Sequence, residues 1–198
     1  MAIESVLDFA HTLATGALAP GDTAVDATVG NGHDTVVLAR AVGPEGRVVG
    51  VDVQAEAIAA TRDRLAGEGL EGRVDLVRAG HETMEAHVPE SRHGQVGAVM
   101  FNLGYLPGGD ASLTTTPRTT LPALDAALRL LRLGGVVTAV LYPGHAGGAE
   151  EATAVEDWAA DLSQARAEAL SYRFVNQRND PPRLVAVEKK SSASGASP

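Results

Sequence analysis

The amino-acid sequence contains no cysteine, which excludes a disulfide framework, a thiolate zinc site and a catalytic thiol. Long apolar runs are also missing, because no segment approaches the roughly 20 uninterrupted apolar residues of a membrane span. The N-terminal segment carries Glu4 and Asp8 without a leading Lys or Arg, which is not the pattern of a signal peptide. We therefore expect a cytoplasmic protein with no membrane segment and no metal site.

Basic residues are scarce, and lysine is almost absent. The 198 residues have a net charge of −9, which argues against a general nucleic-acid-binding protein. Residues 1–100 hold 15 acids and 7 bases, whereas residues 101–198 hold 10 acids and 9 bases, so a polyanion is expected only on the C-terminal half. Of the 16 bases, 14 are Arg, which suits bidentate phosphate contacts, although a skewed genome composition gives the same excess.

Apolar runs alternate with helix-like segments along the chain, which predicts a doubly wound α/β sheet. Strands are expected at residues 24–28, 47–52, 73–78, 96–102, 135–141, 170–175 and 183–188. Helices are expected at residues 3–15, 34–42, 55–67, 81–87, 119–131 and 148–165. The fourth and fifth strands are nearly continuous apolar runs and belong in the middle of the sheet, covered on both faces.

The last two predicted strands are joined by QRNDPP, a turn too short for a helical crossover, so they should pair antiparallel. A mostly parallel seven-stranded sheet with one antiparallel strand is the Rossmann-like architecture of class I methyltransferases, which use S-adenosylmethionine. One domain is expected over residues 1–190. The tail, residues 191–198, lacks apolar side chains and is expected to be disordered.

The stretch VDATVGNGHDT, residues 25–35, has the layout of a nucleotide-cofactor loop. An apolar strand end carries Asp26, two glycines follow at Gly30 and Gly32, and a helix-like run comes next. Glycines let the backbone turn sharply and approach a ligand, and the helix N-terminus offers unsatisfied N–H groups. Taken alone, Asp26 is also a common turn former, and Asn31 also suits left-handed backbone geometry.

A second apolar run, VVGVDV, follows about 20 residues later and places Asp52 where an acid accepts hydrogen bonds from both ribose hydroxyls. Gln54 begins the next helix and can face the adenosine. Gly80 and His81 lie just past the third strand, where such folds line the adenine pocket, although an isolated His is more often a helix-start residue. A dinucleotide loop would need a third glycine where this chain has Thr35, which favours S-adenosylmethionine over a nicotinamide or flavin.

The stretch FNLGYLPGGD, residues 101–110, follows the fourth strand. Open α/β sheets bind ligands outside the carboxyl ends of their strands, so this loop should meet the transferring methyl group. Asn102 and Tyr105 resemble the Asn-Pro-Pro-Tyr loop of methyltransferases that act on nitrogen, where the Asn side chain and a backbone carbonyl accept hydrogen bonds from an amine and the ring stacks on the substrate. Leu103 and Gly104 replace the two prolines, and the stretch is also simply a good turn.

Two further polar loops are expected at the same edge of the sheet. Tyr142 and His145 follow the fifth strand, and His145 is a candidate base or phosphate donor, with a neutral role in the loop equally open. Asn176 and Arg178 lie in the turn between the last two strands. A pocket of low polarity with carbonyl acceptors would favour an unprotonated amine without a dedicated base, whereas a carbon acceptor would usually need the missing cysteine.

The motifs DATVGNGHDT, VDVQ, GHE, FNLGYLPGGD, YPGH and NQRNDPP, taken in order over about residues 3–190, resemble the MnmM family of small bacterial proteins labelled rRNA methylases. The resemblance implies a methyltransferase that acts on the 5-aminomethyl group of 2-thiouridine at the wobble position, 34, of certain tRNAs. It implies cofactor contacts at Asp26, Asn31, Gly32, Asp52, Gln54, Gly80 and His81. It implies substrate-side roles for Asn102, Tyr105, Tyr142 and His145.

A tRNA anticodon stem-loop can be recognised by a local arginine surface and by stacking of an everted base. The candidate arginines are Arg118, Arg173, Arg178 and Arg183, although each alone is more simply an ordinary solvated residue. We find no appended RNA-binding domain, so the catalytic domain would bind the RNA itself, alone or as a homodimer. Methylation of rRNA or of a small-molecule amine stays open, as does a nicotinamide-dependent oxidoreductase.

Overall fold

A computed structural model describes residues 2–104 and 114–190, and in these ranges the chain forms one seven-stranded sheet with helices on both faces. The strands are β1 (Thr23–Asp26), β2 (Arg47–Asp52), β3 (Val74–Arg78), β4 (Val96–Leu103), β5 (Leu131–Leu141), β6 (Ala167–Tyr172) and β7 (Arg183–Lys189). The helices are α1 (Val6–Gly16), α2 (His33–Ala41), α3 (Ala55–Glu68), α4 (Pro117–Leu130) and α5 (Gly148–Ala160), with short 3₁₀ helices η1 (Glu71–Arg73), η2 (His81–His87) and η3 (Glu90–Arg92).

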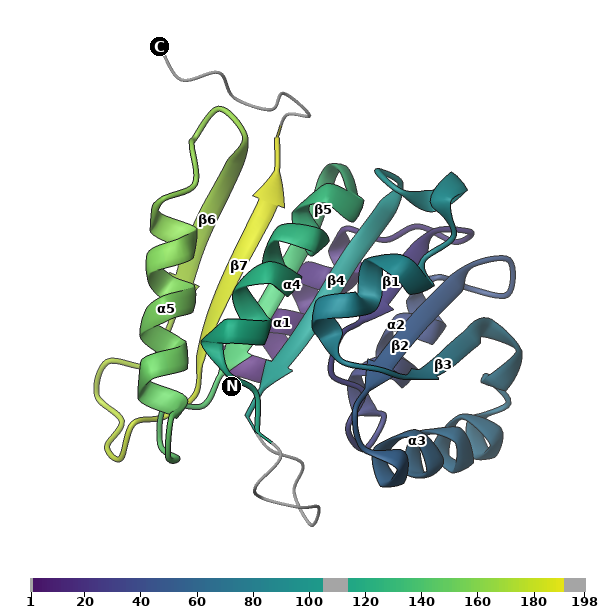
Figure 1. The fold of residues 1–198 in the computed structure, drawn as a ribbon, viewed down its shortest axis with the longest axis horizontal. Coiled ribbons are helices and arrows are strands. Elements are labelled where there is room, and N and C mark those ends of the chain that lie inside the picture. Colours follow the sequence, from purple (N-terminus) through teal and green to yellow (C-terminus); the bar gives the residue numbers. More distant parts are fainter. Residues whose placement is uncertain (1, 105–113, 191–198) are drawn as a thin grey trace.

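The strand order is β3-β2-β1-β4-β5-β7-β6 (Figure 1). β1 to β5 pair in parallel, whereas β7 runs antiparallel to both β5 and β6. The sheet is therefore mostly parallel with one reversed strand, as the sequence predicts. The reversal brings the β6–β7 loop to the same edge of the sheet as the carboxyl ends of β4 and β5.

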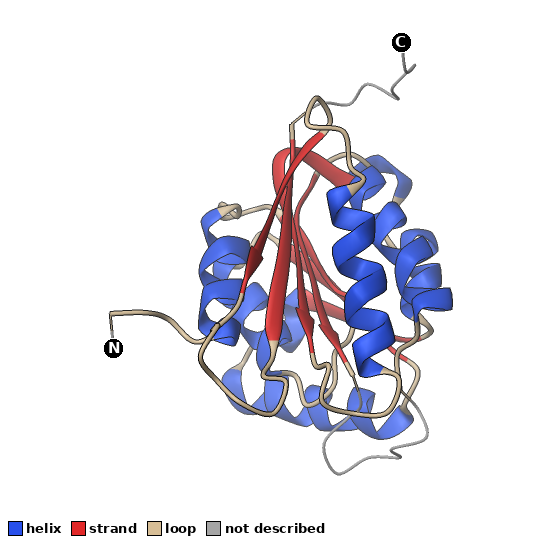
Figure 2. Ribbon diagram, turned by 90° about the vertical axis from the view of Figure 1, so that its left-hand side faces the viewer, coloured by secondary structure: helices blue, strands red, loops and turns tan. Residues whose placement is uncertain are grey.

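The sheet lies between two helical layers, which Figure 2 shows edge-on. Helices α1, α2 and α3 bury side chains in one apolar cluster, and η2, α4 and α5 bury theirs in the other. β4 serves both clusters, because Met100 faces α1 and α2 while Val99 and Phe101 face α4 and α5. This two-sided burial explains why β4 reads as a continuous apolar run. No described helix has the length and apolar content to cross a membrane.

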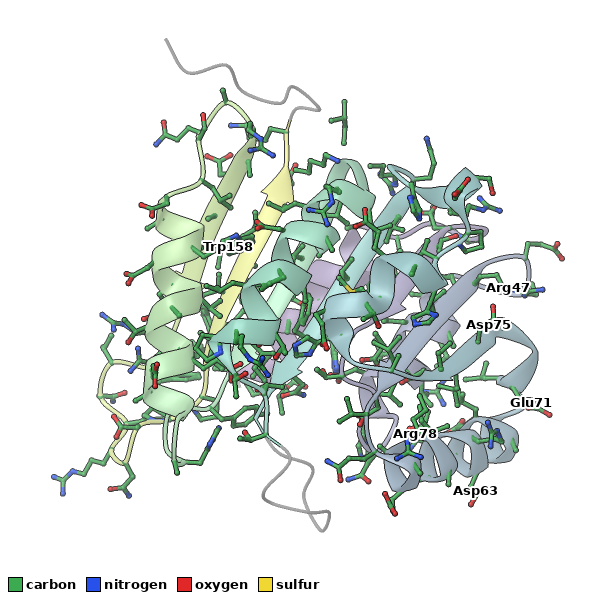
Figure 3. All side chains as sticks on the ribbon, viewed as in Figure 1. Arg47, Asp63, Glu71, Asp75, Arg78 and Trp158 are labelled. Atoms are coloured by element: carbon green, nitrogen blue, oxygen red, sulfur yellow. The ribbon has the colours of Figure 1, made fainter. Side chains whose placement is uncertain are left out.

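Local signals explain where several helices begin and end. The Ser5 hydroxyl caps α1 by accepting a hydrogen bond from the Asp8 backbone N–H, at 3.1 Å. Gly69 ends α3 in the left-handed conformation, with φ of 65°. Between the outer helices, Trp158 of α5 (Figure 3) donates its indole N–H to the Asp125 carboxylate of α4 at 2.9 Å.

Some elements differ from the predicted ones. Residues 81–87 form a 3₁₀ helix, η2, which buries His81 and Met84. β6 begins and ends three residues earlier than predicted, and the chain leaves the sheet at Tyr172, whose hydroxyl donates to the Glu4 carbonyl at 2.9 Å. The predicted tail, residues 191–198, lies outside the described residues.

Candidate active site

Four polar side chains stand at the carboxyl edge of the sheet, on the face that α1, α2 and α3 cover. Side chains alternate between the two faces of a strand, and Ala24, Val48, Met100 and Val140 all belong to the cluster on that face. A residue that lies an even number of positions further along a strand has its side chain on the same face. Such a residue lies at or next to the end of each of these strands, two positions further on in β1, β4 and β5 and four positions further on in β2. These residues are Asp26, Asp52, Asn102 and Tyr142.

Asp26 is fully buried at the end of β1. Its carboxylate accepts hydrogen bonds from the Thr28 backbone N–H at 3.2 Å and from the Thr35 hydroxyl at 2.5 Å. Burial raises the pKa of Asp26 to about 7, and the nearby Asp34 carboxylate adds to this increase, whereas the two hydrogen bonds oppose it. The site therefore holds a carboxylate that a cationic ligand group would stabilise in its ionised form.

The glycine loop is held in a fixed shape by β2 and α3. Asp52 accepts a hydrogen bond from the Gly30 backbone N–H at 2.9 Å, and Thr61 of α3 donates to the Gly30 carbonyl at 3.1 Å. Arg64 of α3 donates to the Asn31 carbonyl at 2.7 Å. These hydrogen bonds attach the glycine loop to β2 and α3.

Gly32 is required by the geometry of this loop. Its φ is 78°, in the left-handed region, and a Cβ at this position would lie 2.7 Å from the Thr61 hydroxyl oxygen. Gly32 also stands directly before α2, whose first N–H groups face the edge of the sheet. Thr61 and the backbone conformation thus explain the glycine within the protein, and the close approach of a ligand to the loop stays a prediction.

The other predicted cofactor residues lie next to this loop. Gln54 is buried at the start of α3, and its backbone N–H donates to Asp52 at 2.9 Å. His81, at the start of η2, is 8% exposed, and its ring packs edge-on against Phe101 with centroids 5.9 Å apart. Its buried Nε2 has no hydrogen-bond partner among the described residues. Burial lowers the pKa of His81, against the opposing charges of Glu82 and Asp52, so its ring is neutral near pH 7.

Gly80 is less constrained than the loop glycines. Its φ of −73° is open to any residue, and the atoms that would lie nearest to a Cβ at this position belong to the flexible end of the Glu82 side chain. The structure therefore places Gly80 beside the site without giving a steric reason for glycine.

Asn102 connects the glycine loop with Tyr142. Its backbone N–H donates to the Thr28 hydroxyl at 2.7 Å, and its side-chain Nδ2 donates to Asp34 at 3.2 Å. Burial and the Asp34 charge raise the pKa of Tyr142, whereas a side-chain hydrogen bond with Asn102 lowers it. Asn102 and Tyr142 are thus brought together, as the strand ends predict.

Asp34 and His11 belong to this network, although neither is among the predicted site residues. Asp34, in the first turn of α2, is 8% exposed, and one of its carboxylate oxygens lies 2.7 Å from Nε2 of His11 on α1. The hydrogen bond with Asp34 raises the pKa of His11. The sequence gives a reason to consider Asp34, since it is an acid inside the glycine motif. Acids are common in the first turn of a helix, however, so this position alone does not indicate a site residue. His11 lies 23 positions away in the sequence, on another helix, and no motif points to it.

The loops after β4 and β5 meet at Gly104. A Cβ on Gly104 would lie 3.6 Å from both His145 Nε2 and Tyr142 Cδ2, which places both side chains beside the start of the FNLGYLPGGD loop. The imidazole Nδ1 of His145 lies 3.0 Å from the Ala146 carbonyl. Tyr105, predicted to stack on the substrate, lies outside the described residues.

Glu151 of α5 anchors the start of α4 and the residues just before it. This side chain is 2% exposed, and its two carboxylate oxygens accept hydrogen bonds from the Thr115 and Thr120 hydroxyls, both at 2.6 Å. The Gly104 carbonyl accepts from the Thr114 hydroxyl and the Thr115 backbone N–H, both at 3.0 Å. These contacts bring Thr114 and Thr115 beside Gly104 and attach the start of α4 to α5.

The predicted RNA-contacting residues divide into two groups. Four are exposed: Arg118, Arg173, Asn176 and Arg178. Arg183 instead pairs with Glu156 of α5 at 3.1 Å, so its charge is already partly neutralised. The β6–β7 loop lies against the loop after β5, since a Cβ on Gly144 would be 3.6 Å from the Asp180 carbonyl. Among the described residues, no group of His, Asp and Glu is arranged to hold a metal ion.

Comparison with known proteins gives the family. A family model described as "Putative rRNA methylase" matches residues 48–188. This chain belongs to that family. A second model, for protein-L-isoaspartate O-methyltransferases, matches residues 2–92, which include the glycine loop.

Solved structures of similar proteins confirm the methyltransferase fold. A "putative rRNA-methylase" from Clostridium thermocellum is 43% identical with a TM-score of 0.90, covering 94% of this chain and 98% of that one. A "putative methyltransferase" from Streptococcus mutans, in complex with S-adenosylhomocysteine (SAH), is 35% identical with a TM-score of 0.84, covering 94% of this chain and 99% of that one.

One curated relative carries a specific name. The "tRNA (mnm(5)s(2)U34)-methyltransferase, chloroplastic" of Arabidopsis thaliana is 40% identical over 163 residues, which are 78% of this chain. The match covers 59% of that relative, so this chain spans about three fifths of its length. Because the name of the relative places it in the chloroplast, the cytoplasmic location of this family member stays a prediction.

The site of this family member fits S-adenosylmethionine. The Asp26 carboxylate, whose pKa burial raises, suits the cationic amino-acid end of the cofactor. Asp52 retains lone pairs for ribose hydroxyls beside its two backbone hydrogen bonds. The buried Nε2 of His81, which has no hydrogen-bond partner in the described part of the chain, is a polar atom that a ligand can satisfy.

We predict that Asp52→Ala weakens SAH binding, because the ribose hydroxyls lose a charged acceptor worth about 1.5–3 kcal/mol, roughly 10- to 150-fold in affinity. Isothermal calorimetry measures this change. Asp75→Ala, which alters an exposed acid on the neighbouring strand β3 (Figure 3), is the matched control and should bind SAH normally. Equal affinity of Asp52→Ala and wild type would refute the ribose placement.

Asp26 gives a pH-dependent prediction for the ligand-free protein. Its folded pKa of about 7 exceeds the ordinary value of 3.8, so the folded state binds the extra proton between these values. The unfolding free energy of wild type should therefore fall, relative to Asp26→Asn, as the pH rises from about 4 to about 7. Urea denaturation of both proteins over this range measures the difference. Parallel pH profiles would contradict the raised pKa.

Proposed function

We propose that this chain is an S-adenosylmethionine-dependent methyltransferase that methylates the amine nitrogen of 5-aminomethyl-2-thiouridine at the wobble position of tRNA. The product would be 5-methylaminomethyl-2-thiouridine. The observation that carries the proposal is the position of Asn102, which lies between the glycine loop and Tyr142. The 40% identity with a relative named for a tRNA wobble-uridine methyltransferase supports the same acceptor.

The residues of this chain divide the work between donor and acceptor. Asp26, Asp52 and His81 would hold the cofactor, which supplies a methyl group on a positively charged sulfur. Asn102 would accept a hydrogen bond from the amine through its Oδ1 and so direct the nitrogen lone pair at that methyl. Positioning of this kind can supply roughly 7–11 kcal/mol of the acceleration.

Gly104 replaces one of the two prolines of the Asn-Pro-Pro-Tyr loop, and its backbone carbonyl is engaged within the protein. That carbonyl already accepts two hydrogen bonds, from Thr114 and Thr115. A carbonyl oxygen has two lone pairs, so its capacity is filled. With the Gly104 carbonyl engaged, Asn102 Oδ1 is the proposed acceptor for the amine hydrogen bond, and Tyr142 and His145 border the same space.

The β6–β7 loop is the proposed contact for the anticodon stem-loop. Its exposed Asn176 and Arg178, together with Arg173 at the start of the loop, lie at the same edge as Asn102. Arg118 extends this surface from the N-terminus of α4. Guanidinium groups suit both phosphates and stacked bases, which allows an acidic chain to bind RNA locally. An rRNA acceptor is the second candidate, because the matching family model carries that description.

A reconstituted reaction tests the proposed function. Purified protein and S-adenosylmethionine are incubated with tRNA from a strain that lacks this gene, and the wobble nucleosides are analysed by mass spectrometry. We expect 5-aminomethyl-2-thiouridine to gain one methyl group. Asn102→Ala should lower turnover while it binds SAH like the wild type. Unchanged tRNA, with methylation of rRNA under the same conditions, would replace this proposal with the second candidate.

A further inference from the structure

Asp34 is a buried acid whose side chain forms hydrogen bonds with α1 and β4. It is 8% exposed, and its two carboxylate oxygens have different partners. Oδ1 lies 2.7 Å from Nε2 of His11, and Oδ2 accepts from Nδ2 of Asn102 at 3.2 Å. Three elements that are separate in sequence, α1, α2 and β4, therefore meet in one hydrogen-bonded chain that ends at the proposed amine contact.

The chemistry of this chain fixes which end of the Asn102 amide faces the substrate. An ionised carboxylate only accepts hydrogen bonds, so the amide NH₂ must face Asp34. The carbonyl Oδ1 must then face away from Asp34. The reverse orientation would present NH₂ to the amine and engage the lone pair that has to attack the methyl group. The Asp34 carboxylate thus favours the productive orientation of the Asn102 amide over the unproductive one.

His11 supplies the counter-charge for the ionised Asp34 that this orientation needs. Asp26 is buried close enough for the Asp34 charge to raise its pKa, so two negative charges at this place are unfavourable without compensation. A protonated Asp34 would donate a hydrogen bond and attract the Asn102 carbonyl instead. The groups that face His11 are Asp34 on α2, Asp26 on β1 and Asp8 on its own helix, and all three favour its cationic form.

We propose that Asp34 and His11 are positioning residues that orient the Asn102 amide so that its carbonyl oxygen accepts from the substrate amine. This inference rests on the proposed function, because it assumes a nitrogen acceptor at Asn102. Neither residue touches the reacting atoms. Their replacement should therefore lower the rate of methyl transfer and leave binding of cofactor and RNA nearly unchanged.

Steady-state kinetics with tRNA that bears 5-aminomethyl-2-thiouridine test whether the rate changes while binding does not. Asp34→Asn preserves size but removes the obligate acceptor, and His11→Phe removes the counter-charge. Both should lower kcat about 10- to 100-fold, because misoriented reacting groups cost rate in this range. KM for tRNA and the SAH dissociation constant should stay within about threefold of wild type, as fits a contact that acts on the rate and not on ground-state binding.

Two further variants separate positioning from general damage. His11→Gln keeps an N–H donor toward Asp34 and should retain more activity than His11→Phe. Asp63→Asn alters an exposed acid on the outer side of α3 (Figure 3) and should match wild type in every measurement. If Asp34→Asn does not fold, the comparison of His11→Phe with His11→Gln still decides the question.

An NMR titration of the free protein gives a readout that does not depend on activity. The His11 imidazole should titrate above its ordinary pKa of 6.5 in wild type, and this elevation should disappear in Asp34→Asn. Wild type that leaves the tRNA unmethylated would contradict the proposed function alone. Active wild type, with Asp34→Asn and His11→Phe turning over at the wild-type rate, would overturn the positioning role.

Discussion

Two buried carboxylates at the carboxyl edge of the sheet set the conditions for the rest of the site. Asp26 and Asp34 lie close enough for the charge of Asp34 to raise the pKa of Asp26, in a place that water does not reach freely. Charges in such a place are costly unless hydrogen bonds or counter-charges compensate them. Thr28 and Thr35 partly compensate Asp26, and the cationic end of a bound cofactor would complete this. His11 and Asn102 compensate Asp34.

The hydrogen bonds of Asp34 connect the part of the molecule proposed to hold the methyl donor with the part proposed to hold the acceptor. β1, β2 and α3 shape the glycine loop, in which nearly every polar backbone group of residues 30–32 has a partner. β4, β5 and the β6–β7 loop carry the residues proposed for the acceptor. Asn102 bridges these two parts through Thr28 and Asp34, so hydrogen bonds connect β4 to the elements proposed to bind the cofactor.

The features of the fold and site that depend on strand periodicity and turn chemistry could be predicted from the sequence. Asp26, Asp52 and Asn102 each end an apolar run, so their common edge followed from the parallel sheet, and the Pro-rich turn predicted the reversal at β7. The partners of these residues were not predictable. His11 meets Asp34 only because α1 packs across β4 and β5, which no local pattern encodes. Glu151 resembled an ordinary acid at a helix start, and only its burial against two threonines showed its role.

A crystal structure with SAH and an anticodon stem-loop that bears 5-aminomethyl-2-thiouridine tests the central claim most directly. The account predicts the homocysteine end beside Asp26, on the α1–α2 face of the sheet. It predicts the amine nitrogen within hydrogen-bond distance of Asn102 Oδ1 and about 5 Å from the cofactor sulfur, because the transferred methyl carbon must fit between them at about 3–3.5 Å from the nitrogen. A cofactor bound away from Asp26, or an amine that approaches from the α4–α5 face without contact to Asn102, would contradict it.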